Sequence, residues 1–330
     1  MDSFDHLFAE FEKKRILVVG DVMIDAYVRG KVNRVSPEAP VPIVSLDKEE
    51  DRLGGAANVA LNLVALGAKP VICSVVGNDR HSKDLQRLLN EAGISGDGLV
   101  FSQDRQTTVK TRVIGNNQQL LRIDSEQTDP ISPAEETALV ERISELLQKD
   151  VDALIFEDYN KGVLTPHVIH AIISEAKKHN IPTTVDPKKD NFFAYKEVTL
   201  FKPNLKELKE GLNKAVRFDP TDKTSFEEAV TELESQLKNK ISFVTLSEHG
   251  VFIRDGKNQH YAEAHPRTIA DVSGAGDTVI AVATLCLASG VSADKIAELA
   301  NIAGGLVCET SGVVPVDREQ LRSEVKRLLK

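Results

Sequence analysis

The sequence predicts a doubly wound α/β fold with a mostly parallel sheet, helices on both faces and a small antiparallel β lid. Two observations carry this prediction. Apolar strand-like segments alternate with amphipathic helical segments along most of the 330 residues, which is typical of repeated βα units. Two insertions interrupt this alternation with strand and turn signals and no helix between them. We expect one domain over residues 1–330, with the lid formed by about residues 26–50 and 105–125.

The elements of the core follow from apolar periodicity. Phe4, Leu7, Phe8 and Phe11 recur at helical spacing and predict a short amphipathic helix. Segment 16–20 (ILVVG) is apolar on both faces, as a buried parallel strand is. The same reasoning predicts strands over 71–76, 153–156, 183–185 and 241–246, and helices over 55–66, 82–92, 166–178, 204–212, 225–238, 276–288, 293–308 and 317–329.

The lid is expected from strands over 41–46, 107–114 and 118–124, with Gly115-Asn116-Asn117 as a hairpin turn. Such a sheet can cover the carboxyl ends of the parallel strands, where open α/β folds bind ligands. An exposed sheet edge tends to pair with another chain. We therefore expect a homodimer in which a partner's lid covers this edge.

Composition narrows the class of protein. With 41 Lys and Arg against 50 Asp and Glu, the formal charge of −9 argues against a nucleic-acid-binding surface. Cys73, Cys286 and Cys308 are far apart and predict buried, reduced thiols. The N-terminus has no signal-peptide pattern, and the most apolar stretch, 279–288, is shorter than the roughly 20 residues of a membrane helix. We expect a cytoplasmic protein that binds neither nucleic acid nor membrane.

Three common catalytic motifs are absent from the sequence. There is no GxxxxGK[ST], which excludes a P-loop nucleotide site. Segment 20–25 reads GDVMID after the first strand, so the GxGxxG of a dinucleotide-dependent dehydrogenase is missing. No GxSxG nucleophile elbow occurs.

The segment Asp271-Val-Ser-Gly-Ala-Gly-Asp277 leads directly into an apolar helix. Gly274 and Gly276 allow a ligand to approach the backbone closely, and their amides with that of Ala275 would suit an anion at a helix N-terminus. Asp277 would lie within a turn of that anion, where a carboxylate can accept a hydroxyl proton during phosphoryl transfer. Taken alone, this stretch is explained equally well by a helix-capping aspartate after a glycine-rich turn.

A second cluster, Gly54-Gly55-Ala-Ala-Asn58, opens another apolar helix. Its small residues would let a ligand lie against the helix start, and the Asn58 amide can both donate to and accept from a sugar hydroxyl. Tight helix packing is the alternative explanation. Asp25 follows the first strand and could hold a polyol hydroxyl at the carboxyl edge of the sheet.

These two motifs, in this order and spacing, resemble the two signatures of the ribokinase (PfkB) family of sugar kinases. Asn204-Leu-Lys-Glu207 is similar to the NxxE element of that family, and Val244-Thr-Leu-Ser-Glu-His-Gly250 is similar to its nucleotide-loop strand. The resemblance extends from about residue 15 to the C-terminus. It implies a ribokinase-like fold and an ATP-dependent kinase of sugars.

Four further segments resemble the branch of the family that phosphorylates heptose 7-phosphate: Ser36-Pro-Glu-Ala-Pro-Val-Pro42, Asn117-Gln-Gln-Leu-Leu-Arg122, Asp158-Tyr-Asn-Lys-Gly162 and Asp186-Pro-Lys188. This resemblance implies transfer of the γ-phosphoryl group of ATP to the anomeric O1 of D-glycero-D-manno-heptose 7-phosphate, in ADP-heptose and lipopolysaccharide precursor synthesis. Another family kinase, for example one acting on fructose 6-phosphate, is an alternative, and a non-catalytic sugar-phosphate-binding regulator is another. A kinase core and lid fill this length, so we expect a separate protein to perform the later nucleotidyl transfer.

The resemblance also implies roles for individual residues. Asp277 would be the base, and Gly274, Ala275 and Gly276 the anion hole. The residues expected at the sugar are Asp21, Asp25, Gly54, Gly55 and Asn58. The residues expected at ATP and its magnesium ion are Asp186, Lys188, Asn204, Glu207, Thr245, Ser247, Gly250 and Asn301, with Asn204 and Glu207 holding Mg²⁺ through water. Asp271 and Ser273 fall where some relatives bind a monovalent cation such as K⁺.

The phosphate of the substrate needs cations of its own. Lys110 and Arg112 are two apart on a predicted strand and share a face. A three-residue hairpin loop would place Arg122 opposite Lys110 on this face, whereas a four-residue loop would place Arg122 on the other. Lys161 is a further candidate, and a solvated strand edge is the alternative explanation for the lid cations.

Overall fold

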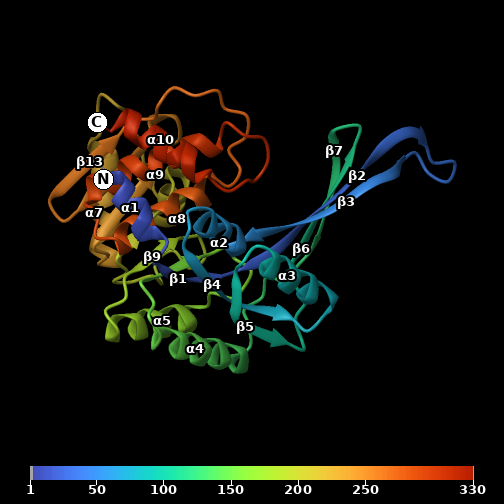
Figure 1. Ribbon diagram of the computed structural model, residues 1–330, viewed down its shortest axis with the longest axis horizontal. Coiled ribbons are helices and arrows are strands. Elements are labelled where there is room, and N and C mark those ends of the chain that lie inside the picture. The colour runs from blue at the N-terminus through green and yellow to red at the C-terminus, as the bar shows by residue number, and fades with distance from the viewer. Residues whose placement is uncertain (1–2, 330) are drawn as a thin grey trace.

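The computed structural model describes residues 3–329 and contains two sheets (Figure 1). The core sheet has the order β13 (Asn258–Ala262), β12 (Val251–Asp255), β11 (Ile241–Thr245), β10 (Leu200–Phe201), β9 (Thr183–Asp186), β8 (Ala153–Glu157), β1 (Arg15–Gly20), β4 (Lys69–Gly77), β5 (Ser95–Ser102). Neighbouring strands from β11 to β5 are parallel, and β12 and β13 join antiparallel. The predicted mostly parallel sheet is confirmed.

Helices cover both faces of the core sheet because successive residues of each strand point to opposite faces. In β1, Ile16 and Val18 belong to one apolar cluster, and Leu17 and Val19 belong to the other. The first cluster includes residues of α1 (Ser3–Phe11), α2 (Ala56–Ala65), α3 (Arg80–Glu91), α8 (Ala275–Ala288), α9 (Ala293–Val307) and α10 (Arg318–Leu328). The second includes residues of α4 (Pro133–Leu147), α5 (Pro166–Lys178), α6 (Leu205–Leu212) and α7 (Thr224–Leu237).

Sequence reasoning places most of these helices correctly, and α5 has the predicted bounds. It misses α4, β2, β5, β10, β12 and β13. The signals of α4 are nevertheless present in the sequence: Pro133 is its first residue, and Ser132 and Glu135 form a capping box.

The lid is a separate sheet that projects from the core, with the order β3 (Pro42–Gly55), β2 (Val22–Val35), β6 (Val109–Gly115), β7 (Gln118–Ser125) (Figure 1). It consists of two antiparallel hairpins, β2–β3 and β6–β7, joined by a parallel pairing of β2 with β6. β2 and β3 have 14 residues each, so the first hairpin is much longer than the predicted strand over 41–46. Only Asp21 separates β1 from β2.

The hairpin between β6 and β7 corrects the expected register. Its loop has two residues, Asn116 and Asn117, both with positive φ (51° and 64°), as a type I′ turn requires. A register shift after Val113 then pairs Arg112, rather than Lys110, with Arg122. Both proposed loop lengths are therefore wrong, but Arg122 still shares the face of Arg112.

Cys73, Cys286 and Cys308 are all buried and unpaired, as predicted. Across residues 3–329, no helix combines the length and apolar character needed to cross a membrane.

Candidate active site

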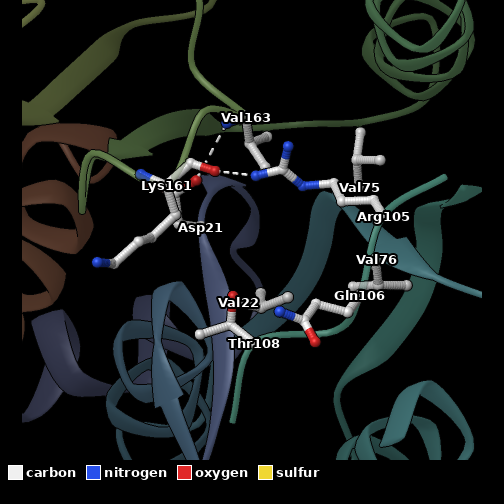
Figure 2. Close-up of a pocket in the computed structure, with 9 residues that line it drawn as sticks. All are labelled: Asp21, Val22, Val75, Val76, Arg105, Gln106, Thr108, Lys161 and Val163. Carbon is white, nitrogen blue, oxygen red and sulfur yellow. Dashed lines mark hydrogen bonds between the residues drawn. The ribbon is translucent and has the colours of Figure 1, made fainter. Parts of the chain in front are cut away.

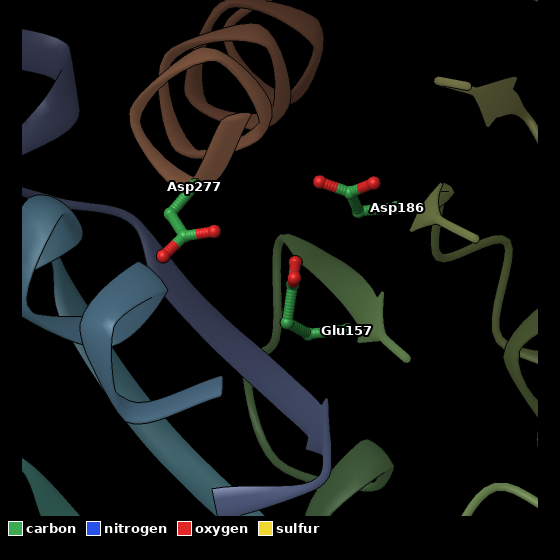
Figure 3. Close-up of side chains that lie close together, drawn as sticks. All are labelled: Glu157, Asp186 and Asp277. Atoms are coloured by element: carbon green, nitrogen blue, oxygen red, sulfur yellow. The ribbon is translucent and has the colours of Figure 1, made fainter. Parts of the chain in front are cut away.

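Three buried carboxylates meet at the carboxyl edge of the core sheet (Figure 3). Glu157 ends β8, Asp186 ends β9, and Asp277 lies in the first turn of α8. One oxygen atom of each lies within 4.8 Å of the others. Parallel strands bring their carboxyl ends to one edge, so residues 120 positions apart in sequence converge here. This edge is the place where the fold class predicts a ligand site.

Glu157 is a member of this group that sequence reasoning misses. Its side chain is fully buried, and within the described part of the chain neither carboxyl oxygen has a hydrogen-bond partner. Burial raises the pKa of Glu157 well above its ordinary value, and the charges of Asp186 and Asp277 raise it further. Carboxylate oxygens are the ligands that Mg²⁺ prefers. The donor set therefore fits a divalent cation, which would use the unpartnered oxygens.

Two lysines offset the negative charge of this group. The Nζ atom of Lys202, a fully buried residue, lies 2.8 Å from an oxygen of Asp186. Lys188 Nζ lies 2.7 Å from Glu207 Oε1 and 3.9 Å from Asp186 Oδ1. Although burial disfavours the charged amines, the neighbouring carboxylates raise the pKa of Lys188 and of Lys202. Both lysines are therefore cations that an incoming phosphate group would meet. Lys202 is another residue that the sequence reasoning misses.

Both oxygens of the Asp277 carboxylate accept side-chain hydrogen bonds. The Asn58 amide donates to Oδ2, and the Tyr159 hydroxyl donates to Oδ1 over 3.1 Å. Burial is the main cause that raises the pKa of Asp277 to about 6, with a further contribution from the charge of Asp186. A carboxyl group with this pKa is ionised at neutral pH and basic enough to accept a proton.

The start of α8 shows whether Asp277 caps this helix. Gly274 is the residue before the helix, with a φ of +81°, and no side chain caps the helix. Because Asp277 instead bonds to Asn58 and Tyr159, the interpretation of Asp277 as a helix cap is wrong. A Cβ atom at Gly276 would lie 3.5 Å from Asp186 Oδ2 and 3.7 Å from Lys202 Nζ. The space beside Gly276 is therefore bordered by the cation of Lys202.

One of the three expected anion-hole amides has a partner. The N–H group of Ala275 donates to the carbonyl oxygen of Val272 at 3.3 Å. An anion would have to compete with the Val272 carbonyl oxygen for the hydrogen bond from the Ala275 N–H group. The prediction that all three amides face an anion needs this correction.

The residues expected at the sugar lie where the lid meets the core. Asp25 in β2 forms an ion pair with Arg112 in β6. A side chain at Gly54 would collide with the Asp25 carboxylate, and Gly55 has a φ of +60° at the entry to α2. The Asn58 Oδ1 atom is buried and lacks a hydrogen-bond partner among residues 3–329, so it can accept from a ligand hydroxyl.

Asp21 has a different environment from the one expected. Its buried carboxylate accepts backbone N–H bonds from Tyr159 (2.9 Å), Lys161 (3.1 Å) and Val163 (3.2 Å). Burial and the charge of Asp158 raise the pKa of Asp21 to about 6 despite these donors. Both oxygens hold the loop after β8, and Oδ1, which accepts one of these bonds, could also accept a hydrogen bond from a sugar hydroxyl.

A small cavity beside Asp21 contains a further residue that sequence reasoning misses, Arg105 (Figure 2). The Arg105 guanidinium donates to the carbonyl oxygens of Lys161, Gln127 (3.0 Å) and Asp129 (2.9 Å). Asp21 therefore accepts hydrogen bonds from N–H groups of the loop after β8, and Arg105 donates to a carbonyl oxygen of the same loop. A lone arginine between two strands carries no sequence signal for this role.

All four cations expected at the substrate phosphate are paired with carboxylates, which form a network on one face of the lid base. Lys110 pairs with Asp124 (3.2 Å) and Glu126 (2.7 Å), and Lys161 pairs with Glu126 (2.7 Å). Arg122 pairs with Asp124 at 2.7 Å. The alternative of a merely solvated strand edge does not describe Lys110, whose side chain is 13% exposed.

Three arginine side chains of the lid lie close to the ring of Tyr27. The guanidinium carbon atoms of Arg52, Arg29 and Arg112 lie 4.9, 5.4 and 5.4 Å from the centre of its ring. Arg52 and Arg29 are absent from the sequence-based candidates. Arg29 lies two residues after Tyr27 on β2, whereas the proximity of Arg52 depends on the pairing of β3 with β2.

Asn204 and Glu207 form a capping box at the start of α6. The Asn204 side chain accepts from the Glu207 N–H, and the Glu207 side chain accepts from the Asn204 N–H, each over 2.8 Å. The NxxE spacing therefore has a structural use in addition to the expected one at magnesium. A bridge between Asn204 and Thr245 places this box beside the end of β11.

Of the remaining residues expected at the nucleotide and the monovalent cation, Ser247 and Gly250 lie in the turn after β11, Asn301 lies in α9, and Asp271 and Ser273 precede α8. Ser247 and Gly250 have positive φ (55° and 84°), and the Asn301 amide donates to the carbonyl oxygen of Glu263 at 2.8 Å. The carboxylate of Asp271 accepts from the N–H groups of Ser273 (2.9 Å) and Gly312 (3.0 Å). These contacts neither use nor exclude the expected ligands.

Comparison with known proteins agrees with a phosphate-binding site at this edge of the sheet. The model of the pfkB family carbohydrate kinases matches residues 13–319. The bifunctional protein HldE of Methylobacillus flagellatus is 39% identical over 326 residues, covering 99% of this chain and 66% of that protein. The HldE protein of Sulfurimonas denitrificans is 40% identical over 310 residues, covering 93% and 63%. The chain thus spans about two thirds of the length of these curated relatives.

Solved structures show the same fold. Phosphofructokinase-2 from Escherichia coli in complex with potassium is similar with a TM-score of 0.78 and 19% identity, over 96% of this chain and 99% of that one. Arabidopsis thaliana ribokinase complexed with ribose and ATP is similar with a TM-score of 0.69 and 17% identity, over 94% and 98%. The expected ribokinase-like fold is confirmed. The chain belongs to the pfkB family of carbohydrate kinases, and it is an ATP-dependent carbohydrate kinase.

Proposed function

We propose that this kinase transfers the γ-phosphoryl group of ATP to the anomeric O1 of D-glycero-D-manno-heptose 7-phosphate and forms the 1,7-bisphosphate. The observation that carries the proposal is the ionisable, buried carboxylate of Asp277 beside the space at Gly276 and the cation of Lys202. The heptose substrate is supported by about 40% identity to the HldE proteins. The product would then enter ADP-heptose synthesis for the lipopolysaccharide core.

In the proposed reaction, the Asp277 carboxylate accepts the proton of the O1 hydroxyl as O1 attacks the γ-phosphorus atom. The bond between O1 and phosphorus forms, the bond to the bridging oxygen of ADP breaks, and ADP leaves with that electron pair. Lys202 and the amides at the start of α8 would stabilise the negative charge on the transferred group. The Asn58 Oδ1 atom and Asp25 would hold neighbouring sugar hydroxyls.

A magnesium ion would neutralise the phosphate charges of ATP. Asn204 and Glu207 would hold it through water, and Asp186 and Glu157 offer further oxygen donors. Lys188, Thr245, Ser247, Gly250 and Asn301 would line the nucleotide. Asp271 and Ser273 would hold K⁺, a role supported only by the resemblance.

The 7-phosphate would bind to the lid cations Lys110, Arg112 and Arg122 together with Lys161. The phosphate would replace the carboxylates that now pair with these side chains, and the planar fork of arginine suits a terminal phosphate.

A homodimer through the lid is also part of the proposal. On β7, Leu121 and Ile123 are 49% and 53% exposed at the sheet edge, where a second lid would cover them. Light scattering at micromolar concentration should give twice the chain mass, and a monomer there would contradict this part. ATP as cosubstrate and three unpaired thiols favour a cytoplasmic location.

The test is a substrate panel with ATP and Mg²⁺, in which product phosphorus is followed by ³¹P NMR. Heptose 7-phosphate should give the 1,7-bisphosphate with the highest kcat/KM. Preferred turnover of fructose 6-phosphate would overturn the heptose assignment and leave a different sugar-phosphate kinase. Tight heptose 7-phosphate binding without turnover of any sugar would instead support a regulator.

A further inference from the structure

Tyr159 is the second hydrogen-bond donor to Asp277, and the mechanism above gives it no role. Its hydroxyl lies 3.1 Å from Asp277 Oδ1, while Asn58 binds the other oxygen from α2. Two donors on opposite elements fix the plane of a carboxylate. Each oxygen can accept more than one hydrogen bond, so the acceptor hydroxyl of a sugar can still bind.

Backbone hydrogen bonds hold the loop that carries Tyr159 in place. Asp21 accepts three backbone N–H bonds of residues 159–163, and Arg105 binds the carbonyl oxygen of Lys161. At Gly162, which has a φ of +86°, an added Cβ atom would collide with the backbone of Asp129. These contacts leave the Tyr159 hydroxyl little freedom to move relative to the core.

The loop is anchored from the opposite side as well. Asp158 accepts hydrogen bonds from the Tyr195 hydroxyl (2.7 Å) and from the Asn160 N–H (2.8 Å). Tyr195 is fully buried and supports the loop without touching Asp277. The chain therefore contains two tyrosine hydroxyls on one loop network, of which one reaches the base.

The surroundings keep the Tyr159 hydroxyl a donor. Burial raises the pKa of Tyr159 well above its ordinary value, and the charges of Asp277, Glu157 and Asp186 raise it further. Lys188 lies over the ring, with its Nζ atom 5.6 Å from the ring centre. A neutral phenol beside a carboxylate can donate but does not compete for the substrate proton.

We propose that Tyr159 is a positioning residue: its hydroxyl holds the Asp277 carboxylate in the orientation that faces the acceptor hydroxyl, on a loop fixed by Asp21 and Arg105. This inference rests on the proposed function, because it assumes that Asp277 acts as the base. The role differs from binding, since Tyr159 acts on a side chain of the protein and not on ATP or sugar. Loss of the hydroxyl should therefore lower kcat and leave KM unchanged.

The experiment compares Tyr159→Phe with the matched control Tyr195→Phe, which removes the other hydroxyl of the network. In Tyr159→Phe, kcat should fall about 10- to 100-fold, with KM for ATP and sugar phosphate within about twofold of wild type. In Tyr195→Phe, the thermal midpoint should fall, but kcat should stay within about twofold. Equal kcat losses in both variants, or an unchanged kcat in Tyr159→Phe, would overturn the proposal.

A second readout needs no turnover. The ¹³C carboxyl resonance of Asp277, assigned by its loss in Asp277→Asn, should move in Tyr159→Phe and stay in place in Tyr195→Phe at one fixed pH. An unmoved resonance in Tyr159→Phe would refute the contact. If wild type phosphorylates no sugar while the resonance moves as expected, the proposed function fails and the positioning of Asp277 by Tyr159 stands.

Discussion

The side-chain amide of Asn58 donates a hydrogen bond to the carboxylate of Asp277 and so joins the start of α2 to the start of α8, 219 residues further along the chain. The two motifs that stand out in the sequence therefore form one site. The same amide group has its oxygen buried and without a partner in the described part of the chain. In the proposed reaction, Asn58 would stabilise the base with one atom and offer another to the sugar.

Replacement of Asn58 by Ala should move the pH dependence of the reaction. The Asn58 hydrogen bond favours the ionised form of Asp277 and lowers its pKa, so its loss raises that pKa. The acid limb of kcat should then shift to higher pH, with kcat at pH 7 reduced about tenfold. Steady-state kinetics between pH 5 and pH 9 check this. An acid limb unchanged from wild type would contradict the role of Asn58.

Replacement of Asp277 by Asn should separate chemistry from folding. Loss of a general base lowers kcat by about 10²- to 10⁴-fold. The near-isosteric amide should keep the hydrogen bond from Tyr159, and ATP binding by calorimetry should stay close to wild type. Turnover near the wild-type rate would show that another group takes the proton.

The wild-type enzyme should lose activity in mild acid. Asp277 must be ionised to accept a proton, and burial raises its pKa to about 6. Activity is therefore present above this pH and is lost as the pH falls through about 6. The pH dependence of kcat with saturating substrates, together with a circular dichroism control for folding at each pH, tests this. A flat kcat down to pH 5 would be inconsistent with Asp277 as the base.

Gly274 and Gly276, at the start of α8, should differ in the effect of replacement by alanine. At Gly276 a Cβ atom meets its nearest neighbours at 3.5 Å, so Gly276→Ala should fold normally but obstruct the approach of a phosphate group. We expect kcat/KM for ATP to fall about 100-fold. Gly274 has a φ of +81°, so Gly274→Ala should lower the free energy of unfolding by about 1–2 kcal/mol. Chemical denaturation and ATP kinetics on both variants test this, and reversed phenotypes would refute it.

Removal of the lid arginines should affect the sugar phosphate alone. Arg112 is more buried than Arg122 (24% against 49% exposed side chain), so Arg112→Ala should raise KM for the sugar phosphate more strongly. We expect an increase of at least about tenfold for Arg112→Ala, a smaller one for Arg122→Ala, and an unchanged KM for ATP in both. An equal effect on an unphosphorylated sugar would mean that these residues do not bind the phosphate.

The sequence predicts the parts of this protein that depend on local pattern. Apolar periodicity finds the core helices and the strands flanked by them, and glycine-rich helix starts lead to Asn58 and Asp277. Local pattern does not predict a site role for Glu157, Tyr159 or Lys202, because their proximity depends on the order of the strands. Strands β8, β9 and β10 are neighbours in the sheet, although long connections separate them in the chain. A glutamate at the end of an apolar strand is the sequence signal that could have identified Glu157.

In the lid, too, local sequence pattern does not determine which side chains face each other. The turn signal at residues 115–117 correctly locates a hairpin, but one shifted residue after Val113 decides which cations face each other. Register of this kind is fixed by the whole sheet and not by the turn alone. Likewise, the environment of Asp21 depends on a loop about 140 residues away, which no local pattern connects to it.

The connection between β1 and β2 has a mechanical consequence. Asp21 is the one residue between core strand β1 and lid strand β2, and Gly55 at the end of β3 is followed directly by α2, so these two positions join the long lid hairpin to the core. The Asp21 carboxylate also accepts backbone hydrogen bonds from the loop that carries Tyr159. A displacement of this hairpin by a ligand at the base of the lid would therefore reach, through Asp21, the loop that supports Asp277.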